Sequence, residues 1–193
     1  MVTRTLCGPP AYVKNNPTTF ADLDGHADPS KQEVIRQINS LADAYKVPRE
    51  TMRAVVRTES NFDVHAKNEN KNKKGKVTST DYGLFQINSK LIGSKVTGSN
   101  GKKFTITQSI KTDWKVNANA GAALVSQAYK TAVKEQTPGN EEDRAQQTYS
   151  QYNAGPGKRD RYLKTDKNGN FADKRDEHFL DNYYSEQKRT DDK

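Results

Sequence analysis

The chain has 193 residues, enough for one domain with a real core, and its nine Tyr and six Phe argue against a fully disordered chain. Hydrophobic residues make up 32%, and a net charge of +8 favours an anionic partner such as nucleic acid, acidic lipid headgroups or bacterial wall polymers. The basic residues carry no nucleic-acid-binding motif, so we expect no nucleic acid among the partners.

Three further features restrict the class of protein. Cys7 is the only cysteine, which excludes an intrachain disulfide and a thiolate zinc cluster. No apolar stretch reaches the roughly 20 residues that span a bilayer, so no membrane span is expected. Residues 1–10 lack the apolar segment of a signal peptide. We therefore expect a soluble chain that is either a trimmed form or reaches its compartment by another route.

The predicted elements begin after an extension. Residues 1–30 hold four of the seven prolines and show no sustained periodicity, so we expect them to be loosely ordered. Apolar residues at the helical period predict a helix from Glu33 to Tyr45, with Ser30 as its cap. Pro48 then starts a second helix, on which Met52, Val55 and Val56 face inward. Glu59 lies near the end of that helix, at the rim of its buried face.

The rest of the chain is predicted to be mostly helical. Residues 63–81 are polar and indicate a loop or short hairpin, and residues 93–112 form a second polar stretch with a possible short strand. Small apolar residues indicate a long, closely packed helix over 116–134. Further helices are expected over 141–152 and 176–187. The predicted fold class is therefore α+β, mostly helical with a small β-hairpin region.

Glu59 is the best-placed candidate for acid chemistry. A carboxylic acid can deliver a proton near neutral pH only if its pKa is raised, and burial against apolar groups raises it. A Glu at a helix end is usually a solvated surface residue, so its position alone is weak evidence. The surrounding sequence is more specific than the position.

Three sequence blocks accompany this glutamate. They are Glu59-Ser60-Asn61-Phe62, the segment Ser79-Thr80-Asp81-Tyr82-Gly83-Leu84-Phe85-Gln86-Ile87-Asn88-Ser89, and Tyr152-Asn153-Ala154-Gly155-Pro156-Gly157. The first two resemble the active-site region of c-type lysozymes. All three, in this order, resemble the soluble lytic transglycosylase (SLT) family, with Phe85 in place of a Met. The resemblance spans roughly residues 33–165 and implies a lysozyme-like fold whose hairpin region flanks the active-site cleft.

The resemblance also implies roles for single residues. Glu59 matches the general acid, and Ser60 matches a serine that helps to hold the carboxyl. Asp81 aligns with the second carboxylate of c-type lysozymes. The expected substrate-binding residues lie in the three blocks and are Ser60, Gln86, Asn88, Tyr152 and Asn153. No cofactor and no metal are implied.

Two mechanisms remain open at this point. A lytic transglycosylase would cut the MurNAc-GlcNAc bond of peptidoglycan and leave a 1,6-anhydro end, which the Tyr152-Asn153-Ala154-Gly155 block favours. A hydrolytic lysozyme would use Asp81 as nucleophile or stabiliser, which the presence of Asp81 favours. A third hypothesis is that the chain is a wall-binding module without catalytic activity. We favour the transglycosylase.

Domain limits, partners and location follow from this reading. We expect an extension over residues 1–30, a catalytic domain over 31–187 and a charged tail over 188–193. The expected partners are peptidoglycan glycan strands and a possible secretion-system or phage-particle protein, and the chain is expected to be a monomer. Because peptidoglycan lies outside the cytoplasmic membrane, the expected location is the periplasm or cell envelope, reached by secretion, injection or phage delivery.

Overall fold

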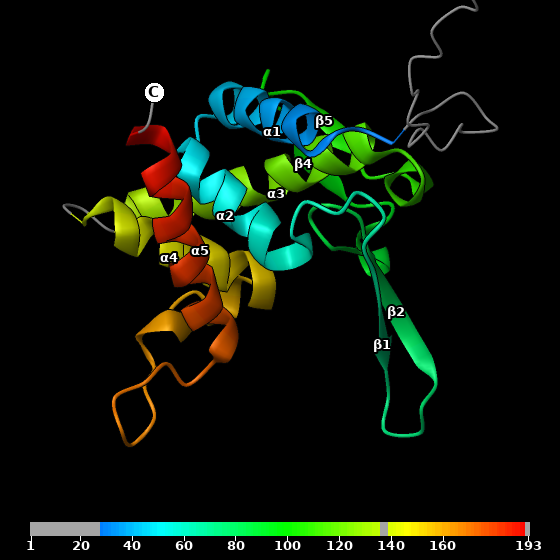
Figure 1. The fold of residues 1–193 in the computed structure, drawn as a ribbon. Coiled ribbons are helices and arrows are strands. Elements are labelled where there is room, and N and C mark those ends of the chain that lie inside the picture. The colour runs from blue at the N-terminus through cyan, green and yellow to red at the C-terminus, as the bar shows by residue number, and fades with distance from the viewer. Residues whose placement is uncertain (1–27, 136–138, 192–193) are drawn as a thin grey trace, which may run out of the picture.

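The computed structural model describes residues 28–135 and 139–191. The longer elements in chain order are α1 (Lys31–Tyr45), α2 (Arg49–Ser60), β1 (Lys67–Lys71), β2 (Val77–Tyr82), β3 (Ile87–Asn88), β4 (Lys95–Thr97), β5 (Lys103–Thr105), α3 (Trp114–Glu135), α4 (Glu141–Ala154) and α5 (Lys174–Asp191). Short 3-10 helices lie at Ser89–Leu91, Gln108–Lys111, Pro156–Lys158 and Arg161–Leu163. Figure 1 shows the helices gathered into one body from which the β1–β2 hairpin projects.

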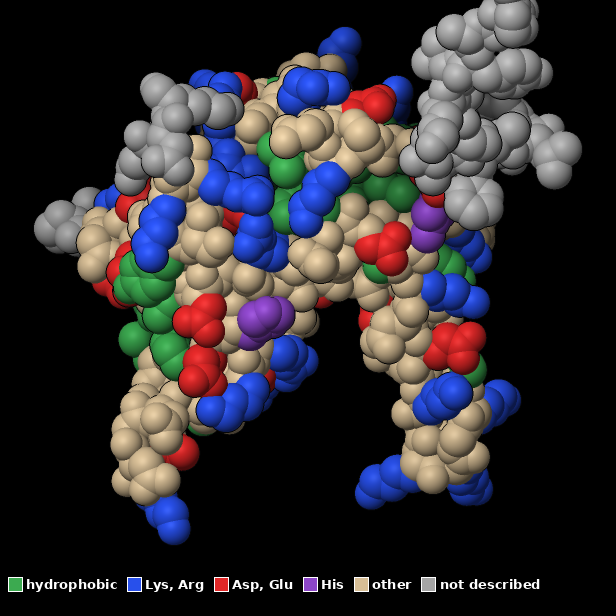
Figure 2. Space-filling view, in the orientation of Figure 1, with side chains coloured by type: hydrophobic (Ala, Val, Ile, Leu, Met, Phe, Trp, Pro, Cys, Tyr) green, Lys and Arg blue, Asp and Glu red, His purple; other side chains and the backbone are tan. Residues whose placement is uncertain are grey.

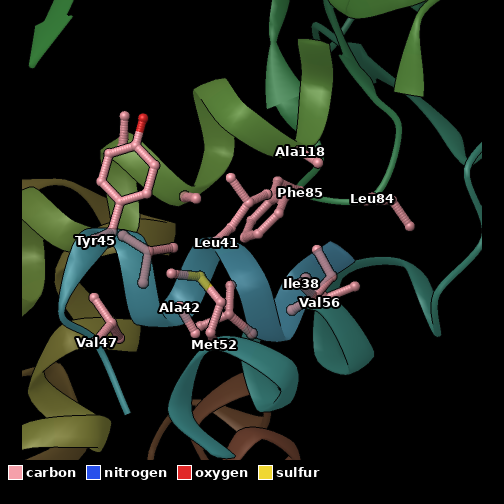
Figure 3. Packing of buried hydrophobic residues seen from close by; sticks show 14 of the residues in the cluster. Ile38, Leu41, Ala42, Tyr45, Val47, Met52, Val56, Leu84, Phe85 and Ala118 are labelled. Carbon is pink, nitrogen blue, oxygen red and sulfur yellow. The ribbon is translucent and has the colours of Figure 1, made fainter. Parts of the chain in front are cut away.

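The core lies between α1, α2 and α3 (Figure 3). Ile38 from α1, Met52 from α2 and Ala118 from α3 are all fully buried in it. Helix α1 begins where the sequence predicts, because the Ser30 hydroxyl accepts a hydrogen bond from the Glu33 amide at 3.2 Å. The inward face predicted for α2 is confirmed, and its last turn carries Glu59 out of the core.

The small sheet is antiparallel, in the order β1–β2–β3. The β1–β2 hairpin pairs Asn68 with Asp81, and the short strand β3 then pairs Asn88 with Asp81 from the other side. Strands β4 and β5 form a separate two-stranded ladder. The polar segment between α2 and β3 is thus a hairpin, as predicted, and it places Asp81 at the base of the projection rather than at its tip.

A tight turn joins the hairpin to the helical core. Gly83 has φ of 66°, and a Cβ there would lie 2.7 Å from the Asn117 side chain, so only glycine fits. The buried Asn117 donates to the Tyr82 carbonyl at 2.8 Å and accepts from the Phe85 amide at 3.3 Å. Phe85 packs against α3 where Gly121 leaves room, since a Cβ on Gly121 would lie 2.1 Å from its ring. These contacts fix the turn relative to α3.

Helix α5 packs against α2 through a buried ionic cluster. Glu186 is fully buried and lies 2.7 Å from the Arg53 guanidinium and 2.8 Å from that of Arg57. Arg53 also donates to the Glu186 backbone carbonyl at 3.0 Å. Because both arginines belong to α2, this cluster holds the helix that carries Glu59 against the C-terminal helix.

The structure confirms the α+β, mostly helical fold with its small hairpin region. Helix α5 is longer than the predicted 176–187, so residues 188–191, which we had expected in the charged tail, are helical. Residues 1–27 of the expected extension, including Cys7, lie outside the described residues, as do residues 192–193. Among the described helices, none is both long enough and apolar enough to cross a membrane.

Candidate active site

A cleft of about 870 Å³ lies between the hairpin and the helical body. Figure 2 shows the molecule hollowed out between the projecting β1–β2 hairpin and the helices. Side chains from both sides line the cleft: Glu59, Asn70, Asp81, Gln86, Asn88, Gln127, Gln151, Tyr152, Asn153 and Arg175 are among them. The wall is rich in hydrogen-bonding groups, as expected for a cleft that binds a sugar polymer.

Glu59 lies at the helical wall of this cleft and is only partly exposed. Loss of solvent around the carboxyl raises its pKa from 4.5 to about 7, and the negative charge of Asp81 adds to this rise. Hydrogen bonds from Asn153 and Tyr149 and the charge of Arg175 act in the opposite direction. The carboxyl can therefore hold its proton near neutral pH and release it without a large cost, as a general acid must.

Asp81 lies on the opposite, hairpin wall. Its Oδ1 accepts a hydrogen bond from the Asn88 amide at 2.7 Å, and its Oδ2 accepts one from the Asn70 amide at 2.8 Å. Both oxygens thus serve as hydrogen-bond acceptors. The two carboxyl groups of the cleft therefore occupy different surroundings, one desolvated and one held by amide donors.

The remaining predicted residues of the cleft wall are held by backbone contacts. The Gln86 side-chain amide donates to the Ala66 carbonyl at 3.1 Å and the Gly83 carbonyl at 3.0 Å. The Tyr152 hydroxyl donates to the Phe85 carbonyl. These contacts link the turn after β2 to the floor of the cleft and to helix α4.

Asn153 and Ser60 have different kinds of partners. The Asn153 amide donates to Oε1 of Glu59 at 3.2 Å, so this residue contacts the acid directly. The Ser60 hydroxyl instead lies 2.9 Å from the Leu84 carbonyl and 3.1 Å from the Val56 carbonyl, and the residue does not line the cleft. The expectation that Ser60 holds the carboxyl or the substrate stays a prediction. Its hydroxyl ties the end of α2 to the turn after β2.

Sequence reasoning missed several residues of the site. Tyr149 precedes Asn153 by one helical turn and so faces the same way, a signal that the spacing on α4 offers. Asn70 enters the site only through the hairpin register, which the sequence does not specify. Arg175 lines the cleft from α5, and both oxygens of Asp173 hold its guanidinium, at 2.9 and 2.6 Å.

Residues 166–169 form a turn, which is closed by a hydrogen bond from the Gly169 amide to the Asp166 carbonyl at 3.1 Å. Asp166 Oδ1 accepts backbone hydrogen bonds from Asn168 at 2.8 Å and Asn170 at 3.0 Å, and Gly169 takes the left-handed conformation. Over residues 28–135 and 139–191, no three His, Cys, Asp or Glu side chains come together in a way that could hold a metal ion.

The family model of the transglycosylase SLT domain matches residues 36–174, which is more than half of the chain. The chain belongs to this SLT family. Searches among curated proteins and among solved structures found no match. Membership implies a protein that acts on peptidoglycan in the cell wall.

The SLT match covers the walls of the cleft almost completely. It includes Glu59 and Asp81, together with the Tyr152-Asn153 pair, and it ends at the first residue of α5. Arg175 and the rest of α5 lie beyond it. The SLT domain of this chain therefore receives part of its support, and one residue of its cleft wall, from a helix outside the matched region.

Proposed function

We propose that this SLT-domain protein cleaves the β-1,4 bond between MurNAc and GlcNAc in peptidoglycan as a lytic transglycosylase, leaving 1,6-anhydroMurNAc ends. The observation that carries the proposal is the environment of Glu59. Its pKa is raised to about 7 by loss of solvent, and it lies in a polar cleft of about 870 Å³ in contact with Asn153. The peptidoglycan substrate follows from family membership.

The proposed reaction has two steps and consumes no water. Glu59 first gives its proton to the glycosidic oxygen as the bond from that oxygen to C1 of MurNAc breaks, and the GlcNAc part leaves as an alcohol. The positive charge that develops at C1 is stabilised by the negative charge of Asp81. Glu59, now a carboxylate, then takes the proton of the 6-hydroxyl of the same MurNAc as that oxygen bonds to C1. Glu59 ends protonated, ready for another cycle.

A hydrolytic muramidase is the second candidate, and the surroundings of Asp81 favour it. Amides hold both of its oxygens on the wall opposite Glu59, as a nucleophile or a fixed stabiliser would require. In that reaction water, rather than the 6-hydroxyl, completes the attack at C1. The two candidates therefore use the same residues and differ in the product.

Mass spectrometry of muropeptides released from purified sacculi separates the two. A transglycosylase yields ends that are lighter by one water molecule than hydrolysed ends and that borohydride does not reduce. In water enriched in ¹⁸O, a hydrolase introduces the label at C1 and a transglycosylase does not. Labelled, reducible ends would overturn the transglycosylase proposal and support the muramidase.

The variant Glu59→Gln tests whether the cleft is catalytic at all. It keeps the shape of the side chain and removes the proton donor, so turnover should fall by about 10²–10⁴. Glu177→Gln, at a partly exposed residue of α5 paired with Lys174, is the matched control and should leave turnover unchanged. Equal activity of wild type and Glu59→Gln would refute the role of Glu59. Absence of cleavage by a folded wild-type protein would favour an inactive wall-binding module.

We further propose that the protein acts in the periplasm or cell envelope, where the substrate lies.

A further inference from the structure

We propose that Arg161, anchored by Asp176, is a positioning residue that orients the Asn153 amide toward Glu59. This inference rests on the proposed function, since it assigns a role in presenting the catalytic acid. Neither residue belongs to the three sequence blocks, and Asp176 lies beyond the family match.

The anchor is a buried, bidentate ion pair. Arg161 is 8% exposed and Asp176 is 2% exposed. The guanidinium donates to both oxygens of Asp176, each at 2.7 Å, and Oδ1 of Asp176 also accepts from the Ser150 hydroxyl at 3.0 Å. Because a planar guanidinium held at two points cannot rotate, its third nitrogen points in a fixed direction.

That third nitrogen, Nη1, contacts Asn153. It donates to Oδ1 of Asn153 at 2.9 Å. A guanidinium has no acceptor, so the amide must turn its oxygen toward Arg161 and its NH₂ group the other way. The NH₂ group then donates to Oε1 of Glu59 at 3.2 Å. Arg161 thereby selects one of the two orientations that an asparagine amide can take.

The orientation of the Asn153 amide decides whether Glu59 faces a hydrogen-bond donor or an acceptor. With the NH₂ group toward Glu59, Oε1 acts as an acceptor, which favours the acid proton on Oε2. If the amide were reversed, its oxygen would face the carboxyl and would repel the carboxylate that forms after proton transfer. The other charged or titratable groups that act on Glu59 are Asp81 from β2, Tyr149 and Tyr152 from α4, and Arg175 from α5. None of these dictates which way the Asn153 amide turns.

The test is a double-mutant cycle of Arg161→Lys and Asn153→Ala, read by turnover and by the pKa of Glu59. Lysine keeps a positive charge beside Asp176, but it cannot hold both carboxylate oxygens and Asn153 together. Arg159→Lys is the matched control, because Arg159 lies outside the cleft and forms only partly exposed ion pairs. Asp176→Asn replaces Arg161→Lys if thermal unfolding shows that the latter does not fold.

Each single variant should lower kcat about tenfold with KM within twofold, because misplacing a catalytic group costs this much or more. The double variant should be no slower than Asn153→Ala alone, since Arg161 acts through Asn153. The Glu59 pKa, followed by ¹³C NMR titration, should rise in both single variants, because each loses a hydrogen bond that favours the carboxylate. Arg159→Lys should match the wild type in all three measurements.

Two results would overturn the proposal. One is a double variant whose kcat falls by the product of the two single losses, because this is what two independent structural defects would give. The other is a Glu59 titration in Arg161→Lys that coincides with that of the wild type. The NMR measurement needs no substrate, so it remains decisive even if the wild type fails to cleave peptidoglycan, which would refute only the proposed function.

Discussion

The two walls of the cleft each present one carboxyl group, but they hold it by different means. On the helical wall, Glu59 extends from a helix that is pinned by the buried ion pairs of Glu186 with Arg53 and Arg57. On the hairpin wall, the Asp81 carboxylate accepts hydrogen bonds from the side-chain amides of Asn70 and Asn88.

The comparison shows how one functional group, the carboxyl, is placed in two different environments. The helical wall excludes solvent, which raises the pKa of Glu59, as the proposed role of proton donor requires. The hairpin wall supplies amide donors, which suit a carboxylate that remains an acceptor. Desolvation requires a rigid body behind it, whereas amide donors need only short side chains on neighbouring strands. Among the residues that the structure describes, the buried ion pairs of Glu186 with Arg53 and Arg57 lie in the helical body, next to the helix that carries Glu59.

The largest expected effect comes from breaking the support of the helical wall. Glu186→Gln would leave Arg53 and Arg57 without their buried counter-charge, and we expect a loss of about 3–5 kcal/mol in the free energy of unfolding. Urea denaturation measures it. Glu177→Gln on the same helix breaks only an exposed pair and should change stability by less than about 0.5 kcal/mol. Similar values for the two variants would mean that the buried cluster does not support the wall.

A second prediction concerns the pH dependence of stability, because the raised pKa of Glu59 makes the free energy of unfolding depend on pH. The folded protein keeps the Glu59 proton up to about pH 7, whereas the unfolded chain releases it near the ordinary value of 4.5. Stability of the wild type should therefore fall as pH rises between these values, and Glu59→Gln should escape this loss. We expect the variant to be about 3 kcal/mol more stable at pH 8 and nearly equal to the wild type at pH 4. A pH-independent difference would contradict the desolvation of Glu59.

The sequence predicted the two walls from different kinds of evidence, which were local patterns for the helices and the hairpin and family resemblance for the site residues. The helices followed from apolar periodicity and from local caps such as Ser30, and the hairpin from its polar composition. Glu59, Asp81 and Asn153 came from resemblance to a family, and the structure brings all three to one cleft.

The residues that sequence reasoning missed depend on tertiary contacts. Glu186 lies in a predicted helix, but glutamate is seldom fully buried, and nothing local indicates two arginines on α2 as its partners. Asn70 reaches Asp81 only because of the pairing register of the hairpin. The contact of the Ser60 hydroxyl with the Leu84 carbonyl was not predicted, because Leu84 comes from the turn after β2.

The third prediction sharpens the contrast at the hairpin wall. Asp81→Asn removes the negative charge with little change of shape. If Asp81 only stabilises developing positive charge, kcat should fall about 10²–10³-fold, the usual cost of losing one electrostatic stabiliser. A kcat of Asp81→Asn lower than that of Glu59→Gln would instead indicate that Asp81 is a nucleophile and that the reaction is hydrolytic. The rate of muropeptide release measures the fall, and the circular dichroism spectrum checks the fold.

The smallest expected effect comes from Asn70→Ala, which removes one of the two amides that hold Asp81. A hydrogen bond to a charged group contributes about 1.5–3 kcal/mol, but Asp81 is partly exposed and water can replace the lost donor. We therefore expect kcat to fall only about threefold, with stability nearly unchanged. Asn100→Ala, in the turn between β4 and β5, is the matched control for the loss of an asparagine side chain. A fall as large as that of Asp81→Asn would show that the hairpin wall, like the helical wall, depends on a fixed arrangement that solvent cannot restore.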